Sequence, residues 1–269
     1  MCGIIGIASS KPVSMNIINS LKRLEYRGYD SAGLATLANS EINEKKCSGR
    51  VEELEKILFK TPSDGNIGIG HVRWATHGIP NVINAHPHSS EIVSVVHNGI
   101  IENSDEIKKD LESKGLKFKS QTDTEVITLL ITEALKNNEP LDSVFKTLKK
   151  LKGSFALGII FKNHKNIIIG ARRGSPLAVG YSNQENYLGS DSYALKSMTN
   201  KISYLDDGDL CVLSKDAVDF YDVNENKINK KVYVLSNDEN QTDKGDYKNF
   251  MSKEIFEQPN TVQTCINEY

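Results

Sequence analysis

Residues 1–8 read Met-Cys-Gly-Ile-Ile-Gly-Ile-Ala, a run of small and β-branched apolar residues that predicts a buried strand over residues 3–8. No basic segment precedes this run and no small-residue cleavage site follows a long apolar region, so it is not the pattern of a signal peptide. If Met1 is removed, Cys2 carries its thiol beside a free α-amine, whose reference pKa of about 7.7–8.0 suits a general base. One residue can then supply nucleophile and base together. By position alone, the simpler interpretation is a small apolar residue at the start of a strand.

The apolar pattern beyond this strand predicts an α+β chain with strands at both ends and helices between them. A helix is expected to follow Ser14 as its N-cap, with apolar positions at Ile17, Ile18, Leu21 and Leu24. Further strands are predicted over residues 33–38, 67–75 and 92–96, and helices over 103–115, 122–137 and 140–151. After Gly153 the chain breaks into short β-rich pieces at 155–162, 166–171, 177–181, 186–189, 201–204, 209–213, 216–221 and 232–235. Large sheets of this kind need helical cover.

Composition and charge are those of an ordinary globular protein. The 269 residues are 38% hydrophobic and 25% charged, and 33 basic against 35 acidic side chains leave a net charge of −2. This balance predicts no nucleic acid and no membrane as a partner, and no apolar run approaches the length of a bilayer span. The four cysteines are scattered without a close pair, which argues against a disulfide framework or a zinc ribbon and favours a reducing, cytoplasmic location.

Six motifs occur in the first half of the chain. They are CGIIG at 2–6, LEYRGYDSAG at 24–33, HVRWATHG at 71–78, NAHPH at 84–88, HNGIIEN at 97–103 and TDTE at 122–125. In this order they resemble the glutaminase domain of glucosamine-6-phosphate synthases, a class-II glutamine amidotransferase with an N-terminal nucleophile. The resemblance implies the four-layer αββα sandwich of N-terminal-nucleophile hydrolases, in which two antiparallel sheets stack and helices cover both sides. It implies no metal and no cofactor.

The resemblance also divides the chain into two parts. It runs over residues 2–235, which predicts a glutaminase domain there. Residues 236–249 contain almost no apolar side chain and predict a linker, and residues 250–269 are helix-capable. The stretch KEIFEQP at 253–259 resembles the segment that leads into the sugar-isomerising half of that enzyme. Residues 236–269 are therefore expected to be a linker and the start of the connection to an absent sugar-isomerase domain.

The resemblance implies catalytic roles for Cys2, Asn98 and Gly99. Cys2 is the implied nucleophile. Its attack on a carboxamide creates an oxyanion, which donors fixed before the reaction stabilise best. The side-chain NH₂ of Asn98 and the N–H of Gly99 are implied to be these donors. Asn-Gly is also the strongest short hairpin signal, so a plain β-turn is the alternative, and the two roles can coexist.

Arg73 and Asp123 are implied to bind the two charges on the α-carbon of glutamine. Arg73 would hold the α-carboxylate in a two-pronged contact, and Asp123 would receive the α-amine. The alternative for Arg73 is a surface ion pair. The alternative for Asp123 is to stabilise the dipole of a helix that begins with the capping box Thr122-x-x-Glu125. The resemblance places Thr76 and His77 next to the substrate and Arg27 near the nucleophile. It implies that Trp74 gates the passage of ammonia. Core filling is the alternative for Trp74.

Histidines at five nearby positions raise the question of a metal site: His71, His77, His86, His88 and His97. On a strand, the two rings of His86-x-His88 would share one face. The proline between them favours a loop, and no cysteine or carboxylate pattern accompanies them, so no metal site is predicted. Three further cysteines are expected to be buried or incidental thiols: Cys47, Cys211 and Cys265.

Together these residues predict hydrolysis of L-glutamine to L-glutamate and ammonia through a γ-glutamyl thioester on Cys2. In the full-length enzyme of the resemblance, ammonia passes to fructose 6-phosphate in the sugar-isomerase domain to make glucosamine 6-phosphate. The resemblance allows a homodimer of the full-length form. Three alternatives are weaker. The residue forms at 29–31 and 74–77 disfavour a purine-pathway phosphoribosyl amidotransferase, and the intact catalytic and binding residues disfavour a silent binding module. A self-processing peptidase would need a propeptide before Cys2, where the sequence has only Met1.

Overall fold

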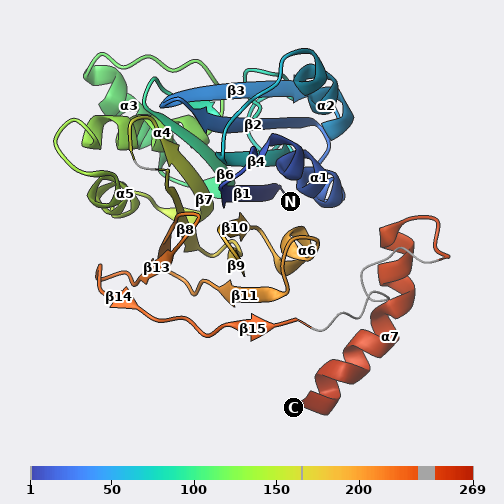
Figure 1. Cartoon of the computed structure of the whole chain (residues 1–269). Coiled ribbons are helices and arrows are strands. Elements are labelled where there is room, and N and C mark those ends of the chain that lie inside the picture. Colours follow the sequence, from blue (N-terminus) through green and yellow to red (C-terminus); the bar gives the residue numbers. More distant parts are fainter. Residues whose placement is uncertain (1, 165, 236–245, 269) are drawn as a thin grey trace. The chain divides into compact units, whose positions relative to one another are not determined.

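Two antiparallel sheets form the centre of this protein (Figure 1). The computed structural model describes residues 2–164, 166–235 and 246–268, and the chain divides into two compact units, Met1–Leu235 and Ser236–Tyr269. In the first unit, one sheet has the strand order β15-β11-β9-β10-β1-β4-β2-β3 and the other has the order β14-β13-β12-β8-β7-β6-β5. The strands of the first sheet are β1 (Gly3–Ser9), β2 (Ser31–Ala38), β3 (Glu41–Ser48), β4 (Ile67–Arg73), β9 (Ala178–Ser182), β10 (Glu185–Gly189), β11 (Lys201–Tyr204) and β15 (Tyr233–Val234). Those of the second sheet are β5 (His88–Ser89), β6 (Val93–Ile101), β7 (Gly153–Phe161), β8 (Ile168–Arg173), β12 (Leu210–Leu213), β13 (Val218–Tyr221) and β14 (Lys227–Ile228).

Strand β1 lies inside the first sheet, with β4 on one side and β10 on the other. Ile5 and Ile7 point into one hydrophobic core, and Ile4 and Ala8 point into another. A strand that is buried on both faces needs apolar residues at successive positions, which explains the continuous apolar run at the start of the sequence.

Helices cover the outer face of each sheet. Three pack against the first sheet: α1 (Ser14–Leu24), α2 (Val51–Lys60) and α6 (Ser192–Leu195). Three others form the layer over the second sheet: α3 (Ser104–Ser113), α4 (Thr124–Ala134) and α5 (Pro140–Leu148). One hydrophobic core lies under each layer of helices and a third lies between the sheets. This four-layer αββα sandwich confirms the predicted fold class.

Several predicted elements differ from those in the structure. α1 begins at Ser14 itself and its cap residue is Val13, so Ser14 is not the N-cap. The strand predicted to end at residue 96 continues as β6 to Ile101. β3 and α2 have no predicted counterpart. β3 is an edge strand with mostly exposed or half-buried side chains, so it needs little apolar periodicity.

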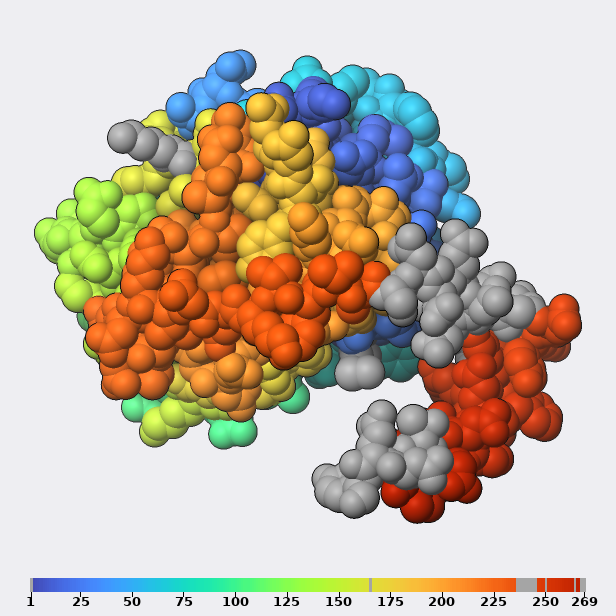
Figure 2. Space-filling model, turned by 60° about the horizontal axis from the view of Figure 1, so that its bottom comes forward, coloured from blue at the N-terminus to red at the C-terminus, as the bar shows by residue number. Residues whose placement is uncertain are grey.

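The segment from β14 to β15, orange in Figure 2, lies on the surface of the first unit. It connects the edge of the second sheet, where β14 lies, to the edge of the first sheet at β15. The described part of the second unit contains α7 (Phe250–Glu268), which has Pro259 in its interior and matches the helix-capable segment of the sequence. Much of the predicted linker, residues 236–245, lies outside the described residues. Over the described ranges, no helix has both the length and the apolar character that crossing a membrane requires.

Candidate active site

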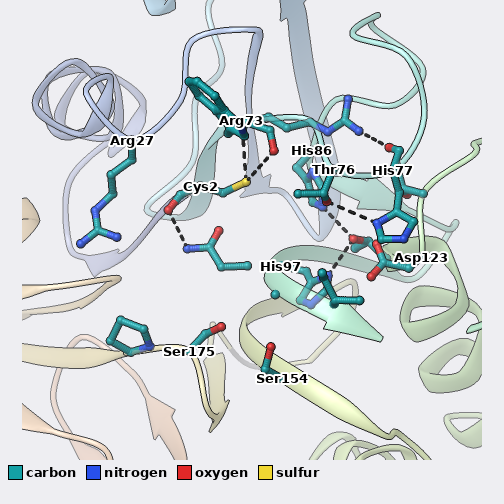
Figure 3. A pocket seen from close by; sticks show the side chains of 17 residues that line it. Cys2, Arg27, Arg73, Thr76, His77, His86, His97, Asp123, Ser154 and Ser175 are labelled. Atoms are coloured by element: carbon teal, nitrogen blue, oxygen red, sulfur yellow. Dashed lines mark hydrogen bonds between the residues drawn. The ribbon is translucent and has the colours of Figure 1, made fainter. Parts of the chain in front are cut away.

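A cavity of about 290 Å³ contains every residue to which the resemblance assigns a role (Figure 3). Both sheets and the connections between strands contribute to its lining, which consists of Cys2, Arg27, Arg73, Trp74, Thr76, His77, His86, His97, Asn98, Gly99, Ile100, Thr122, Asp123, Thr124, Ser154, Ser175 and Pro176. Its volume is at the small end of the range for ligand pockets, so it suits a molecule the size of one amino acid.

Cys2 is placed by the register between β1 and β4. Gly3 lies opposite Val72, so Cys2 comes next to Arg73 and Trp74 at the end of β4. The backbone N–H of Trp74 donates to the Cys2 Sγ at 3.3 Å, and the thiol points to the Trp74 carbonyl oxygen at 3.5 Å. Burial raises the pKa of the Cys2 thiol, and the hydrogen bond from Trp74 offsets part of this rise. The thiol therefore needs a base to become a nucleophile at neutral pH.

The motif at residues 24–33 holds the segment that faces Cys2. The carboxylate of Asp30 accepts a hydrogen bond from the Ala75 N–H, and the Asp30 N–H donates to the Arg73 carbonyl at 3.2 Å. A Cβ on Gly28 would lie 2.5 Å from the carbonyl carbon of Arg73, so only glycine permits this approach. Gly28 and Asp30 thus fix the backbone beside Cys2.

Asn98 and Gly99 lie inside β6, which continues to Ile101 while paired with β7. The hairpin-turn alternative for this dipeptide is therefore wrong. The Asn98 Nδ2 donates to the Cys2 carbonyl oxygen at 3.0 Å, which places the amide beside Cys2. Gly99 has a φ of +131°, and a Cβ there would lie 2.1 Å from the Ser154 carbonyl oxygen. Both the backbone angle and the close approach require glycine.

Arg73 is buried, with 3% of its surface exposed, so it is not part of a surface ion pair. Its guanidinium donates to three successive carbonyl oxygens, those of His77, Gly78 at 3.3 Å and Ile79 at 3.5 Å. Within the described part of the chain, no carboxylate lies within the ion-pair distance of 4.0 Å from it. A buried cation without a carboxylate partner can hold an anion in the cavity.

Asp123 is the cap residue of α4, but its side chain makes no capping hydrogen bond. One carboxylate oxygen accepts from the Ile101 N–H at 2.8 Å, and no basic side chain of the described residues lies within ion-pair distance. The predicted capping box is absent. The Thr122 hydroxyl instead bonds to the His88 ring at 2.9 Å, and the Glu125 carboxylate accepts from two backbone N–H groups of the preceding loop.

Trp74, Thr76 and His77 form an exposed part of the cavity wall. Trp74 is 49% exposed, so the core-filling alternative is wrong. Its ring meets that of Tyr29 edge to face, with centroids 5.8 Å apart. The Thr76 hydroxyl lies 3.3 Å from the Nδ1 atom of His77.

Arg27 approaches the cavity from another side and is already paired. Its guanidinium forms an ion pair with Asp191, and its Nε donates to the Tyr26 hydroxyl at 3.1 Å. The second oxygen of Asp191 accepts from the Ala194 N–H at 2.9 Å and caps α6. Because Arg27 has this partner, Arg73 is the better placed residue to bind an anion.

Four buried histidines lie together near the cavity: His71, His86, His88 and His97. The rings of His71 and His86 stack with centroids 4.1 Å apart. The Thr124 hydroxyl contacts the His86 Nε2 at 2.8 Å and the His97 Nδ1 at 2.9 Å. Burial lowers the pKa of all four rings, that of His71 to about 3, so they are neutral near physiological pH. The part of the chain that the structure describes holds no cluster of three or more candidate metal ligands.

Part of the cavity wall has no counterpart in the sequence interpretation. His86 and His97 enter that interpretation only as candidate metal ligands, whereas both line the cavity as neutral rings. Ser154 and Ser175 also line it. Ser190 is not part of the lining, and its Oγ accepts a hydrogen bond from the Asn98 Nδ2 at 3.1 Å. Single serines far apart in sequence carry no motif, so only the histidines offered a signal.

Known proteins resemble this chain over its whole length. A family model described as a glutamine amidotransferase domain matches residues 71–197. The glutamine–fructose-6-phosphate aminotransferases (isomerizing) of Zymomonas mobilis and Mesorhizobium japonicum are 46% and 47% identical over 270 aligned positions. These alignments cover 100% of this chain and 44% of each relative. The chain thus spans less than half the length of the curated relatives that it matches.

Solved structures share the fold at lower identity. A glutamine phosphoribosylpyrophosphate amidotransferase from B. subtilis has a TM-score of 0.73 and 24% identity, and the match covers 84% of this chain and 50% of that one. A glutamine aminotransferase class-II domain protein from Silicibacter pomeroyi has a TM-score of 0.58 and 14% identity, covering 82% and 99%. These two likenesses support the fold alone. By the family model and the curated relatives, the chain matches the glutamine amidotransferase half of glutamine–fructose-6-phosphate aminotransferases.

Proposed function

We propose that this chain hydrolyses L-glutamine to L-glutamate and ammonia, with Cys2 as the nucleophile. The observation that carries the proposal is a pair of buried charges, Arg73 and Asp123, that have no ion-pair partner among the described residues and line the same cavity as the Cys2 thiol. A free amino acid carries a carboxylate and an ammonium group on one carbon. Each charged residue can bind one of these groups, which leaves the side-chain amide of glutamine for Cys2.

The first half of the reaction forms a thioester. The Cys2 thiol gives its proton to its own α-amine, and the sulfur adds to the amide carbon of glutamine. The charge that develops on the amide oxygen is held by the N–H groups of Asn98 Nδ2 and Gly99. The α-amine then returns the proton to the leaving nitrogen, the carbon–nitrogen bond breaks, and ammonia departs.

The second half releases glutamate. Water adds to the carbon of the γ-glutamyl thioester while the α-amine of Cys2 takes one of its protons. The same donors hold the second oxyanion. The carbon–sulfur bond then breaks, the sulfur recovers the proton, and the free thiol and L-glutamate result. Because the α-amine must be free in both halves, active protein is expected to lack Met1, which intact-mass measurement checks.

For the whole protein, the names of the curated relatives support a further step. Ammonia would be transferred to fructose 6-phosphate to make glucosamine 6-phosphate, in the cytoplasm. Residues 2–235 would then be the glutaminase domain, and residues 236–269 a linker and the start of the connection to a sugar-isomerase domain. The half-exposed Trp74 lines the glutamine cavity, where it would gate the passage of ammonia.

Release of glutamate and ammonia by the purified chain tests the proposal. Wild type should turn over L-glutamine, whereas Cys2→Ala should lose turnover and keep its melting temperature. Cys265→Ala, which removes an exposed thiol of the second unit, is the matched control and should stay active. A glutamine analogue with an electrophilic side chain should label Cys2 alone. Turnover by Cys2→Ala, or labelling at another cysteine, would refute the assignment.

The sugar step needs a separate assay. Incubated with both L-glutamine and fructose 6-phosphate, these 269 residues should release glutamate but form no amino sugar. The reason is that the described part of residues 236–269 contains one helix and no core on which a sugar site could be built. Detection of glucosamine 6-phosphate among the products would contradict the domain assignment without affecting the glutaminase proposal.

A further inference from the structure

We propose that His71 is a positioning residue that fixes the orientation of the Asn98 side-chain amide, so that its NH₂ group is held as the donor of the oxyanion hole. This role rests on the proposed function and adds a residue to it. His71 is fully buried in β4 and is not part of the cavity lining. It would act on the reaction through Asn98 alone.

The contacts of His71 define which of its ring nitrogens carries the proton. Its Nε2 lies 3.1 Å from the His97 carbonyl oxygen and 3.0 Å from the Asn98 Oδ1. A backbone carbonyl oxygen can only accept, so Nε2 carries the proton and donates to both oxygens. The Nδ1 atom then has the lone pair, and it lies buried without a partner among the described residues. Burial lowers the pKa of this ring to about 3, so the neutral form persists at neutral pH.

The two ends of the Asn98 amide are not interchangeable in this setting. With Oδ1 held by His71, Nδ2 donates to the Cys2 carbonyl oxygen at 3.0 Å and to the Ser190 Oγ at 3.1 Å. The reversed amide would place an NH₂ group against the Nε2–H of His71 and an oxygen against the Cys2 carbonyl oxygen. Both contacts would be repulsive, so the two neighbours select the same orientation.

This orientation matters for the chemistry at Cys2. An oxyanion is stabilised by N–H donors that are in place before the charge develops, and an amide oxygen in the same place would repel it. Both protons of the Asn98 NH₂ group have partners here, so the N–H that faces the Cys2 carbonyl oxygen would be shared with the oxyanion. Removing the donor of His71 should therefore lower the rate of the chemical step. It should leave the binding of glutamine unchanged, because Arg73 and Asp123 provide the proposed contacts to the α-carbon.

Two substitutions of similar length separate the hydrogen bond from the volume of the ring. His71→Gln can place an N–H near the position of Nε2, whereas His71→Met has no donor. We expect His71→Met to lower kcat about tenfold or more, toward the loss of about 10²–10³ that follows removal of an oxyanion donor, with KM within about threefold of wild type. His71→Gln should keep kcat within about fivefold of wild type, because the conservative variant restores the donor.

A double-mutant cycle tests whether His71 acts through Asn98. In an Asn98→Ala background, His71→Met should change kcat by less than about twofold, because the group that it positions is gone. Equal losses in both backgrounds would assign His71 a general structural role and overturn the proposal. A wild-type kcat for His71→Met would overturn it as well, and so would a loss that His71→Gln fails to rescue.

A measurement on the unsubstituted protein keeps the proposal testable if His71→Met does not fold. Nitrogen-15 NMR of labelled histidines should show His71 protonated at Nε2, with the signal assigned through its proximity to the Asn98 side chain. A ring protonated at Nδ1 would contradict the proposal. If wild type does not hydrolyse glutamine, the proposed function fails by itself, whereas the NMR result still reports on the contact between His71 and Asn98.

Discussion

The carboxylate of Asp123 accepts a hydrogen bond of 2.8 Å from the backbone N–H of Ile101, two residues beyond Gly99 in β6. This bond joins the start of α4 to the strand that carries Asn98 and Gly99. Asp123 therefore has two tasks in the proposed mechanism. One oxygen fixes the strand, and the other is left for the α-amine of glutamine. Substitution can separate these tasks.

Asp123→Asn should raise KM for glutamine about 10- to 100-fold with kcat nearly unchanged, because an amide oxygen can still accept from Ile101 while the negative charge is lost. Asp123→Ala should raise KM by a similar factor. It should also lower the free energy of unfolding by about 1–3 kcal/mol, because the N–H of Ile101 loses its partner. Steady-state kinetics and urea unfolding of both variants check this prediction, and equal unfolding midpoints would argue against the strand-fixing task.

Arg73→Lys should also raise KM about 10- to 100-fold at nearly constant kcat. Lysine keeps the charge but cannot hold the carbonyls of residues 77–79 and bind a carboxylate in a two-pronged contact at the same time. The α-amide of L-glutamine, which lacks the carboxylate, is the matched control substrate. The substitution should hardly alter kcat/KM for this amide. A fall by the same factor for both substrates would indicate a displaced loop and not a lost carboxylate contact.

Gly99→Ala should lower kcat about 100-fold or more and destabilise the fold. Its added Cβ would lie 2.1 Å from the Ser154 carbonyl oxygen, in addition to the strain of a φ of +131°. Gly115→Ala is the matched control, because its φ is +86° and its added Cβ would have no neighbour within 4 Å. That control should carry only the backbone strain, about 1–2 kcal/mol. Thermal unfolding compares the two, and an equal loss of stability would speak against the close approach.

Acid should destabilise the fold through the buried histidines. Burial lowers the pKa of His71 from its ordinary value of 6.5 to about 3. As the pH falls below 6.5, the unfolded chain binds a proton that the folded chain does not bind, so the free energy of unfolding decreases. Between pH 7.5 and 5.0 His71 alone should account for about 2 kcal/mol. Urea unfolding at the two pH values measures the loss, which should be about 2 kcal/mol smaller for His71→Gln. The same loss in both proteins would contradict the prediction.

Apolar periodicity and motifs together predicted much of this fold. β1 was predictable because both of its faces are buried, which forces successive apolar residues. β3 was not, because it pairs with one neighbour only and most of its side chains are exposed or half-buried. The N-caps predicted at Ser14 and Thr122 were wrong. The Glu125 carboxylate binds backbone N–H groups of residues 119 and 120, and that choice depends on the path of the preceding loop.

In the candidate site, local motifs were predictable from the sequence, whereas contacts between distant segments were not. The motifs pointed to every residue that was proposed from the sequence, and all of them line one cavity. The Asn98-Gly99 dipeptide was ambiguous because its turn signal is local, whereas the Ser154 carbonyl that demands glycine belongs to the neighbouring strand. Ser190 contacts Asn98 from 92 residues further along the chain, so no local pattern could reveal it.

The position of β1 between β4 and β10 lowers the entropic cost of ordering Cys2, the proposed nucleophile. The ends of most chains fray, and a residue there loses conformational entropy when it is held still. Cys2 directly precedes a strand that is bonded on both sides, so this entropy is lost once, when the sheet forms, and not again with each molecule of glutamine. For protein engineering, a purification tag placed before Cys2 would extend from the wall of the cavity, whereas one attached after residue 269 would be joined to the second unit.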